Sequence, residues 1–96
     1  MNEIKDRTFV LIGRMGYPHA DVKKEIRRRG GRIKSEVTSE TNYLIRGVIH
    51  PTDRTAERDS SQIEQAIRLQ KEGCEIRIMW PHDLFAMFAD ADEQNC

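Results

Sequence analysis

The five residues from Thr8 to Ile12, with the sequence TFVLI, restrict the fold more than any other part of this chain. The run is rich in β-branched and aromatic residues, and Gly13 ends it, which is typical of a β-strand. Because apolar and polar residues do not alternate within it, both of its faces must be covered. Strands of this kind are typical of parallel sheets that carry helices on both sides.

Helical and strand patterns alternate along the rest of the chain. Apolar residues spaced three or four apart predict helices, and short β-rich runs bounded by glycine predict strands. Ser61 and Glu64 have the spacing of a capping box, so the second helix is expected to begin there. After the first strand, the expected order is helix 19–29, strand 32–34, strand 41–46, helix 61–72, strand 75–79 and helix 81–89. This order predicts an α/β fold with a mainly parallel sheet and helices on both faces.

Three glycines lie at the boundaries of the predicted helices and strands. Gly30 stands where the first helix must end, so we expect it in the left-handed backbone conformation that glycine adopts at little cost. Gly31 is expected to let the chain pass close to a neighbouring segment, and Gly47 is expected to close the strand at 41–46.

The 96-residue length allows one small domain, which we place at residues 5–89. The remaining residues, 90–96 (DADEQNC), are expected to form a flexible acidic tail. Asp90 and Asp92 are interpreted as part of that tail and not as a cation site. The methionines inside the domain are expected to pack in the core or at its edge: Met15, Met79 and Met87.

Charge is distributed unevenly along the chain, although the net charge is zero. Residues 1–48 carry 11 lysines and arginines against 6 acids, and residues 49–96 carry 5 against 10. Many of the cations lie in the first helix and the strand after it: Lys23, Lys24, Arg27, Arg28, Arg29, Arg32 and Lys34. Such a cluster suits a nucleic-acid backbone, and a simple solvated helix face is the equal alternative. No aromatic residues lie between these cations to support stacking on single strands.

The chain lacks the patterns of an active site or a metal centre. No glycine-rich phosphate loop or nucleophile elbow is present. Metal-ligand spacing is absent among the residues that would supply it: His19, His50, His82, Cys74 and Cys96. We therefore expect no enzyme activity, no cofactor and no metal.

The expected location follows from the cysteines and the apolar runs. Two cysteines are too few for a disulfide framework, so free thiols in a reducing compartment are the simplest interpretation. The amino-terminal run is too short for a signal peptide, and the longest apolar run, residues 84–89, is too short to span a membrane. We expect a cytoplasmic protein (in the bacterial cytosol or nucleoid) or a nuclear one, with no membrane partner.

Several of these segments together resemble a BRCT domain over residues 5–88. The resemblance is carried by TFVLIG, IRRRGGRI, VTSETNYLIRG, SSQIEQAIRLQKEG and IRIMWPHDLFAMF. Within the family it is greatest to the BRCT domains of bacterial NAD-dependent DNA ligases and of the clamp-loader large subunit. It implies a four-stranded parallel sheet with helices 1 and 3 on one face and helix 2 on the other. Leu84 takes the place of a tryptophan that many members carry, and Trp80 is interpreted as a partly buried packing residue in preference to a ligand contact.

The resemblance also implies where a phosphate would be recognised. The family's pocket uses a hydroxyl at the end of the first strand, the next glycine amide and a lysine early in the second helix. These fall on Ile12, Gly13 and Gln62, of which Ile12 cannot hydrogen-bond a phosphate and Gln62 brings no charge. An arginine of the ligase and clamp-loader group corresponds most nearly to His19, interpreted as an exposed loop histidine in preference to an anion contact. Phosphopeptide binding through this pocket is therefore expected to be weak or absent.

The expected function is that of a non-catalytic interaction module in DNA replication or repair, which docks a protein partner or the DNA backbone. The alternative is an accessory domain of a larger DNA-processing enzyme, such as an NAD-dependent DNA ligase.

Overall fold

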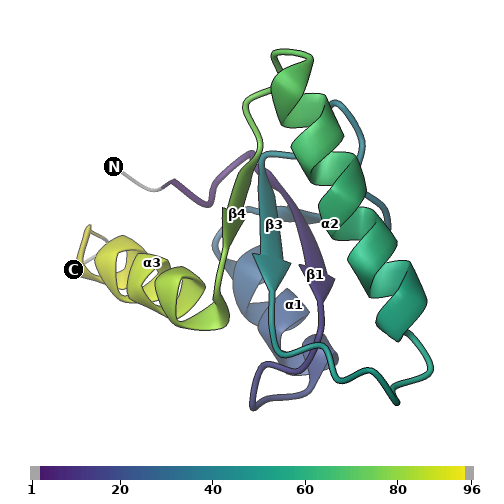
Figure 1. Cartoon of the computed structure of the whole chain (residues 1–96). Helices are drawn as coiled ribbons and strands as arrows, with labels where there is room; N and C mark the ends of the chain where they lie inside the picture. The colour runs from purple at the N-terminus through teal and green to yellow at the C-terminus, as the bar shows by residue number, and fades with distance from the viewer. Residues whose placement is uncertain (1–2, 95–96) are drawn as a thin grey trace.

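All four strands of the sheet run parallel, in the order β2-β1-β3-β4. Figure 1 shows β1, β3 and β4 side by side. The computed structural model describes residues 3–94. The elements in chain order are β1 (Thr8–Ile12), α1 (His19–Arg28), β2 (Arg32–Ile33), β3 (Tyr43–Arg46), α2 (Ala56–Lys71), β4 (Arg77–Met79) and α3 (Pro81–Gln94). The predicted α/β class and the predicted order of helices and strands are confirmed. None of the helices in the described residues is long and apolar enough to cross a membrane.

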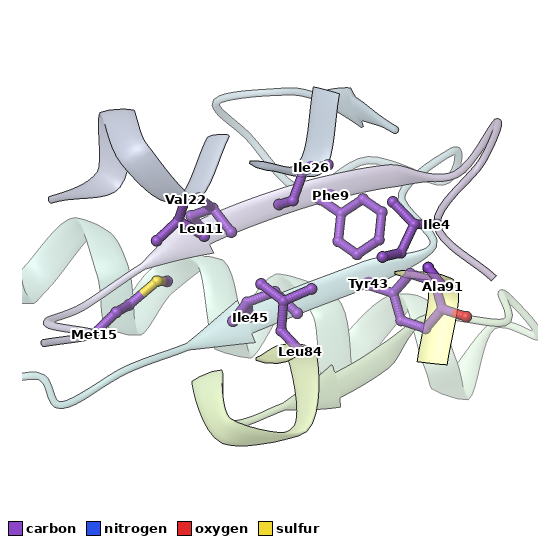
Figure 2. Packing of buried hydrophobic residues seen from close by; sticks show 10 residues of the cluster. All are labelled: Ile4, Phe9, Leu11, Met15, Val22, Ile26, Tyr43, Ile45, Leu84 and Ala91. Carbon is purple, nitrogen blue, oxygen red and sulfur yellow. The ribbon is translucent and has the colours of Figure 1, made fainter. Parts of the chain in front are cut away.

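Helices α1 and α3 cover one face of the sheet (Figures 1 and 2). The stripe of α1 that faces the sheet contains Val22 and Ile26, and α3 contributes Leu84, which is fully buried. The rings of Phe9 and Tyr43 stack within this core with their centroids 4.9 Å apart. Its buried members are Ile4, Phe9, Leu11, Met15, Val22, Ile26, Tyr43, Ile45, Leu84 and Ala91, and Met79 and Met87 pack at its edge.

Helix α2 covers the opposite face. Its fully buried Ala66 packs in a second core together with Val10, Ile12, Val37, Leu44 and Ile76. Successive residues of β1 therefore point into different cores, which is why every residue of TFVLI is buried. The predicted placement of helices 1 and 3 on one face and helix 2 on the other is confirmed.

The glycines occupy the positions that their sequence context predicts. Gly30 follows α1 with a φ of +91°, the left-handed conformation expected at the end of that helix. A Cβ on Gly31 would lie 2.5 Å from Cγ2 of Ile26, so only glycine permits this close passage. A Cβ on Gly47 would overlap the carbonyl group of Arg14, because the segments that follow β1 and β3 touch at this point.

Two helix ends differ from the predictions. Helix α2 begins at Ala56, so Ser61 and Glu64 lie inside the helix and not at its start. Helix α3 continues to Gln94, so the flexible tail predicted at residues 90–96 is wrong for 90–94. The apolar stripe of α3 extends that far because Ala91, seven residues after Leu84, is also buried. Residues 95–96, which include Cys96, lie outside the described residues. Cys74 is a half-buried free thiol beside the second core.

Candidate functional site

A cleft of about 380 Å³ lies at the carboxyl end of β1. The strands that neighbour β1 are β2 on one side and β3 on the other, so the chain leaves these strand ends in different directions. Parallel α/β sheets bind ligands at this kind of switch point. The first turns of α1 and α2 both border the cleft through His19, Thr55 and Arg58. Their peptide dipoles direct positive partial charge toward it, which favours an anion.

Four cationic side chains from four different segments line this cleft: Arg14, Lys23, Lys34 and Arg58. The cleft also contains two carboxylates, Asp53 and Asp59. Within residues 3–94 neither Lys23, Lys34 nor Arg58 forms an ion pair with a carboxylate. Three positive charges therefore remain available to an anion that enters the cleft.

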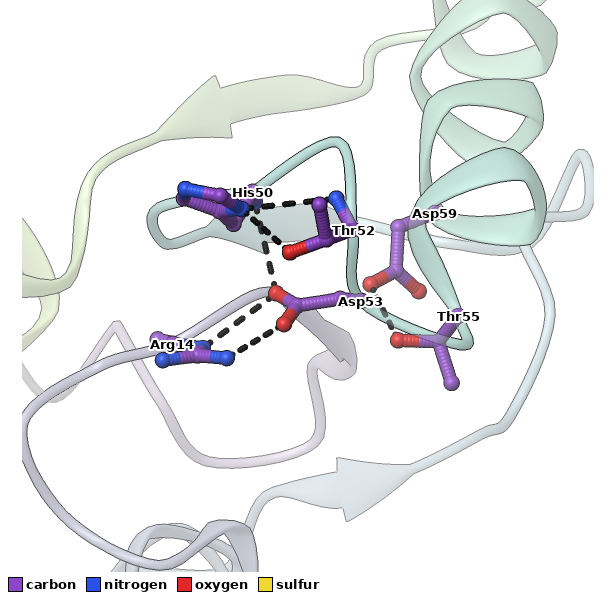
Figure 3. Close-up of polar contacts among 6 residues, drawn as sticks. All are labelled: Arg14, His50, Thr52, Asp53, Thr55 and Asp59. Carbon is purple, nitrogen blue, oxygen red and sulfur yellow. Dashed lines mark hydrogen bonds and ion pairs between the residues drawn. The ribbon is translucent and has the colours of Figure 1, made fainter.

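Both carboxylates already have partners (Figure 3). Asp53 forms a two-pronged ion pair with Arg14, in which Nε of Arg14 lies 3.2 Å from Oδ2, and it also accepts the backbone N–H of His50 at 3.3 Å. The hydrogen bonds from Arg14 hold the pKa of Asp53 below its usual range, so this carboxylate stays ionised at neutral pH. Asp59 is buried and accepts the hydroxyl of Thr55 at 3.1 Å.

The predicted phosphate-pocket residues do meet in this cleft, but three of them serve the fold. Ile12 is buried in the second core, on the face of the sheet that α2 covers. His19 donates from Nε2 to the carbonyl oxygen of Gly13 at 2.6 Å, so its interpretation as an exposed loop histidine is wrong. Gln62 accepts the backbone N–H of Val37 through Oε1 at 2.7 Å, which fixes the segment after β2.

Six of the seven predicted patch cations form what we call the cationic face. Lys24, Arg27, Arg28, Arg32 and Lys34 are exposed, and half-buried Lys23 joins them to the cleft. On α1 these cations occupy the arc opposite Val22 and Ile26, and β2 continues the surface with Arg32. The cationic face and the cleft therefore share two cations, Lys23 and Lys34.

Arg29 does not belong to the cationic face, so its predicted place there is wrong. Its side chain is 6% exposed and forms a two-pronged ion pair with Asp92 of α3, at 2.7 and 3.1 Å. Arg29 also donates to the carbonyl oxygen of Glu25 at 2.9 Å and lies 4.3 Å above the ring centroid of Phe88. The hydrogen bonds from Arg29 lower the pKa of Asp92. Arg29 therefore links the end of α1 to α3 through an ion pair and a cation–π contact.

Two of the cleft cations were missed by the sequence predictions. Arg58 precedes the predicted start of the second helix at Ser61, but it belongs to the first turn of α2. Arg14 follows the glycine that ends β1. Ligands bind at the carboxyl ends of the strands in parallel sheets, so this position in the sequence could have identified Arg14 as a candidate site residue. No group of three or more metal-ligating side chains is found within residues 3–94.

No protein-family model matches the chain. Part of the chain is similar to the DNA ligase of Thermodesulfovibrio yellowstonii, at 39% identity over 44 residues, and to the DNA ligase of Prochlorococcus marinus, at 39% identity over 46 residues. These matches cover 46% and 47% of this chain and 7% of each ligase. The chain is therefore similar to a short segment of these DNA ligases and spans only a small fraction of their length.

Proposed function

We propose that this chain is a non-catalytic BRCT-type module of DNA replication or repair that docks on the DNA backbone. The observation that carries the proposal is that the cationic face and the cleft share Lys23 and Lys34, and that three cations of the cleft lack acidic partners within the described residues. The parallel four-stranded sheet with three helices supports the BRCT assignment, as does the similarity to segments of DNA ligases.

Recognition of this kind reads phosphates and not bases. Exposed lysines and arginines on one face release counterions from the backbone when they bind it, so affinity depends little on sequence and strongly on salt. Lys23 connects the cleft to Arg27, one helical turn further along α1. Arg32 and Lys34 add charge from β2 and the segment after it. A phosphopeptide would gain less here, because Ile12 and Gln62 supply neither the hydroxyl nor the charge that the family's pocket uses.

The proposal is tested by the anisotropy of a fluorescein-labelled DNA duplex titrated with the protein. Binding at about 50 mM salt should weaken at least tenfold at about 200 mM if several phosphates are contacted. Replacing Arg27, Arg28 and Arg32 by glutamate should reduce affinity by roughly a hundredfold or more, since three charge-assisted contacts are lost. Circular dichroism should show an unchanged fold, because all three side chains are exposed.

A matched control changes the same net charge on a different surface. Arg68, Lys71 and Arg77 are exposed and lie at the carboxyl end of α2 and the start of β4. In Figure 1 the carboxyl end of α2 lies at the opposite end of the sheet from the carboxyl end of β1, where the cleft is. Replacing these three by glutamate should retain most of the affinity. Equal losses in both triple variants would mean that only overall charge matters, and no binding by the parent at low salt would refute backbone docking.

The second candidate is an accessory domain of a larger DNA ligase. It is favoured by the two ligase matches, each of which covers only 7% of the relative. The two candidates predict different sizes for the natural protein. An immunoblot of the source cells that shows a band near 11.2 kDa supports the free-standing module, and a much larger band supports the accessory domain.

A further inference from the structure

Trp80 occupies an unusual place for the only tryptophan of the chain. It directly follows β4 and precedes the first residue of α3, and its side chain is 43% exposed. Its backbone is held firmly, because Trp80 donates its N–H to the carboxylate of Asp83 at 3.3 Å and its carbonyl accepts the N–H of Asp83 at 3.1 Å. The backbone that carries the exposed indole is therefore held in place by Asp83.

The guanidinium of Arg46 stacks on this indole, 4.2 Å from the ring centroid. Nε of Arg46 is buried and has no hydrogen-bond partner in the part of the chain that the structure describes, and Nη2 reaches only the carbonyl of Gly47 at 3.5 Å. None of the ion pairs within residues 3–94 involves Arg46. The stacked pair thus combines an aromatic ring with a positive charge that no carboxylate of residues 3–94 pairs with.

Strand register places this pair beside the cleft. Ile12, which lines the cleft, is the partner of Arg46 across β1 and β3. Ile45 is the partner of Met79 across β3 and β4, so Trp80 follows at the level of Arg46. Ile12 points toward α2, and the alternation of β3 and β4 directs Arg46 and Trp80 to the same side. Two strand spacings, about 10 Å in all, separate the end of β1 from Trp80.

We propose that Trp80, backed by Arg46, is a stacking site for an unpaired base of a DNA strand whose phosphate occupies the neighbouring cleft. A basic groove beside an aromatic side chain is the combination that single-strand binding sites use, and every base has a face that can stack. The guanidinium contributes a cation–π contact to the assembly. The cations of the cleft have no aromatic neighbours in the sequence, but the parallel sheet brings Trp80 to the same edge, where the strands end. This inference rests on the proposed docking to DNA and adds the kind of DNA structure that is preferred.

The single tryptophan makes a direct test possible. The protein is titrated with two DNA probes at about 50 mM salt, a blunt duplex and the same duplex with a short single-stranded overhang. Stacking of a base should quench the fluorescence of Trp80 with the overhang probe, in parallel with binding measured by anisotropy of a labelled strand. The overhang probe should also bind more tightly than the blunt duplex.

Substitutions separate stacking from general binding. Trp80→Leu should weaken binding of the overhang probe by roughly fivefold to a hundredfold, the range of one base–aromatic stack, while Trp80→Phe should retain much of it. Blunt-duplex affinity should change little in both variants. Tyr17→Leu is the matched control, because Tyr17 is also an exposed aromatic, at 62%, that contacts Phe85 of α3 and does not line the cleft. It should bind both probes like the parent.

The fluorescence and affinity results decide whether Trp80 is a stacking site. Saturating binding without a change in Trp80 fluorescence, or a Trp80→Leu variant that binds the overhang as tightly as the parent, overturns the stacking site and leaves backbone docking intact. Trp80 is then a packing residue for Arg46. If neither probe binds at low salt, the proposed docking and the stacking site both fall.

Discussion

Arg28 and Arg29 are adjacent in the sequence, yet they belong to two regions with opposite roles. The side chain of Arg28 is 61% exposed on the cationic face, where Glu25 is its only ion-pair partner within the described residues. Arg29, one residue on, is enclosed by Asp92, the Glu25 carbonyl and the Phe88 ring. A run of like charges on a helix therefore does not act as one unit. The 100° turn per residue sends one arginine to solvent and the next to the neighbouring helix.

The largest expected effect comes from removing the buried member of this pair. Arg29→Ala should lower the free energy of unfolding by about 2–3 kcal/mol, because charge-assisted hydrogen bonds and a cation–π contact are lost together. Arg28→Ala should change it by less than about 0.5 kcal/mol, since exposed ion pairs contribute little. Chemical denaturation of the two variants gives both values. Equal destabilisation by the two substitutions would remove the distinction between the regions.

A smaller effect is expected at the turn that separates the two regions. Gly30→Val should destabilise the fold by about 1 kcal/mol or more, because a β-branched residue is strained at a φ of +91°. The added Cβ would meet Cγ of Lys5 at 3.1 Å, a flexible neighbour that can move aside, so strain and not overlap should dominate. Thermal unfolding measures the change. An unchanged melting temperature would be inconsistent with a left-handed Gly30.

The smallest effect is a dependence of stability on pH in the Arg29 region. The pKa of Asp92 is lower in the folded protein than its ordinary value of 3.8, chiefly because Arg29 hydrogen-bonds the carboxylate. This contribution to stability is complete above the ordinary pKa and is lost as pH falls through the lowered one. Asp92→Asn should therefore lower the melting temperature at pH 7, with a smaller difference from the parent at pH 3. A difference that grows on acidification would contradict the assigned direction.

Much of the fold follows from local patterns in the sequence. Residues 8–12 lack alternation because both faces of β1 are covered, and the first glycine after α1 adopts the conformation that helix termination requires. The end of α3 was missed although its signal exists, since Leu84, Phe88 and Ala91 have helical spacing. Arg29 likewise follows Val22 and Ile26 at intervals of seven and three, which places it on the buried stripe and not on the cationic face.

The candidate site was less predictable, because its parts are assembled by the topology of the sheet. Arg14 and Arg58 are 44 positions apart in the sequence, and no local pattern connects them. Only the parallel order β2-β1-β3-β4 brings the segments after β1 and β3 together, where Arg14 and Val48 form an isolated bridge. Hydrogen bonds of His19 and Gln62 to the backbone are also invisible to sequence patterns, since they depend on distances between segments.

The short outer strands have a consequence for the behaviour of the protein at high concentration. The free edge of a sheet offers unpaired backbone groups to which a second molecule can add a strand. Here β2 has two residues and β4 has three, and exposed Arg32 and Arg77 begin them. Two copies that approached along β2 would bring Arg32 and Lys34 of each molecule together, and their repulsion opposes such growth. The same cations that suit a phosphate backbone thus also discourage intermolecular β-sheet formation.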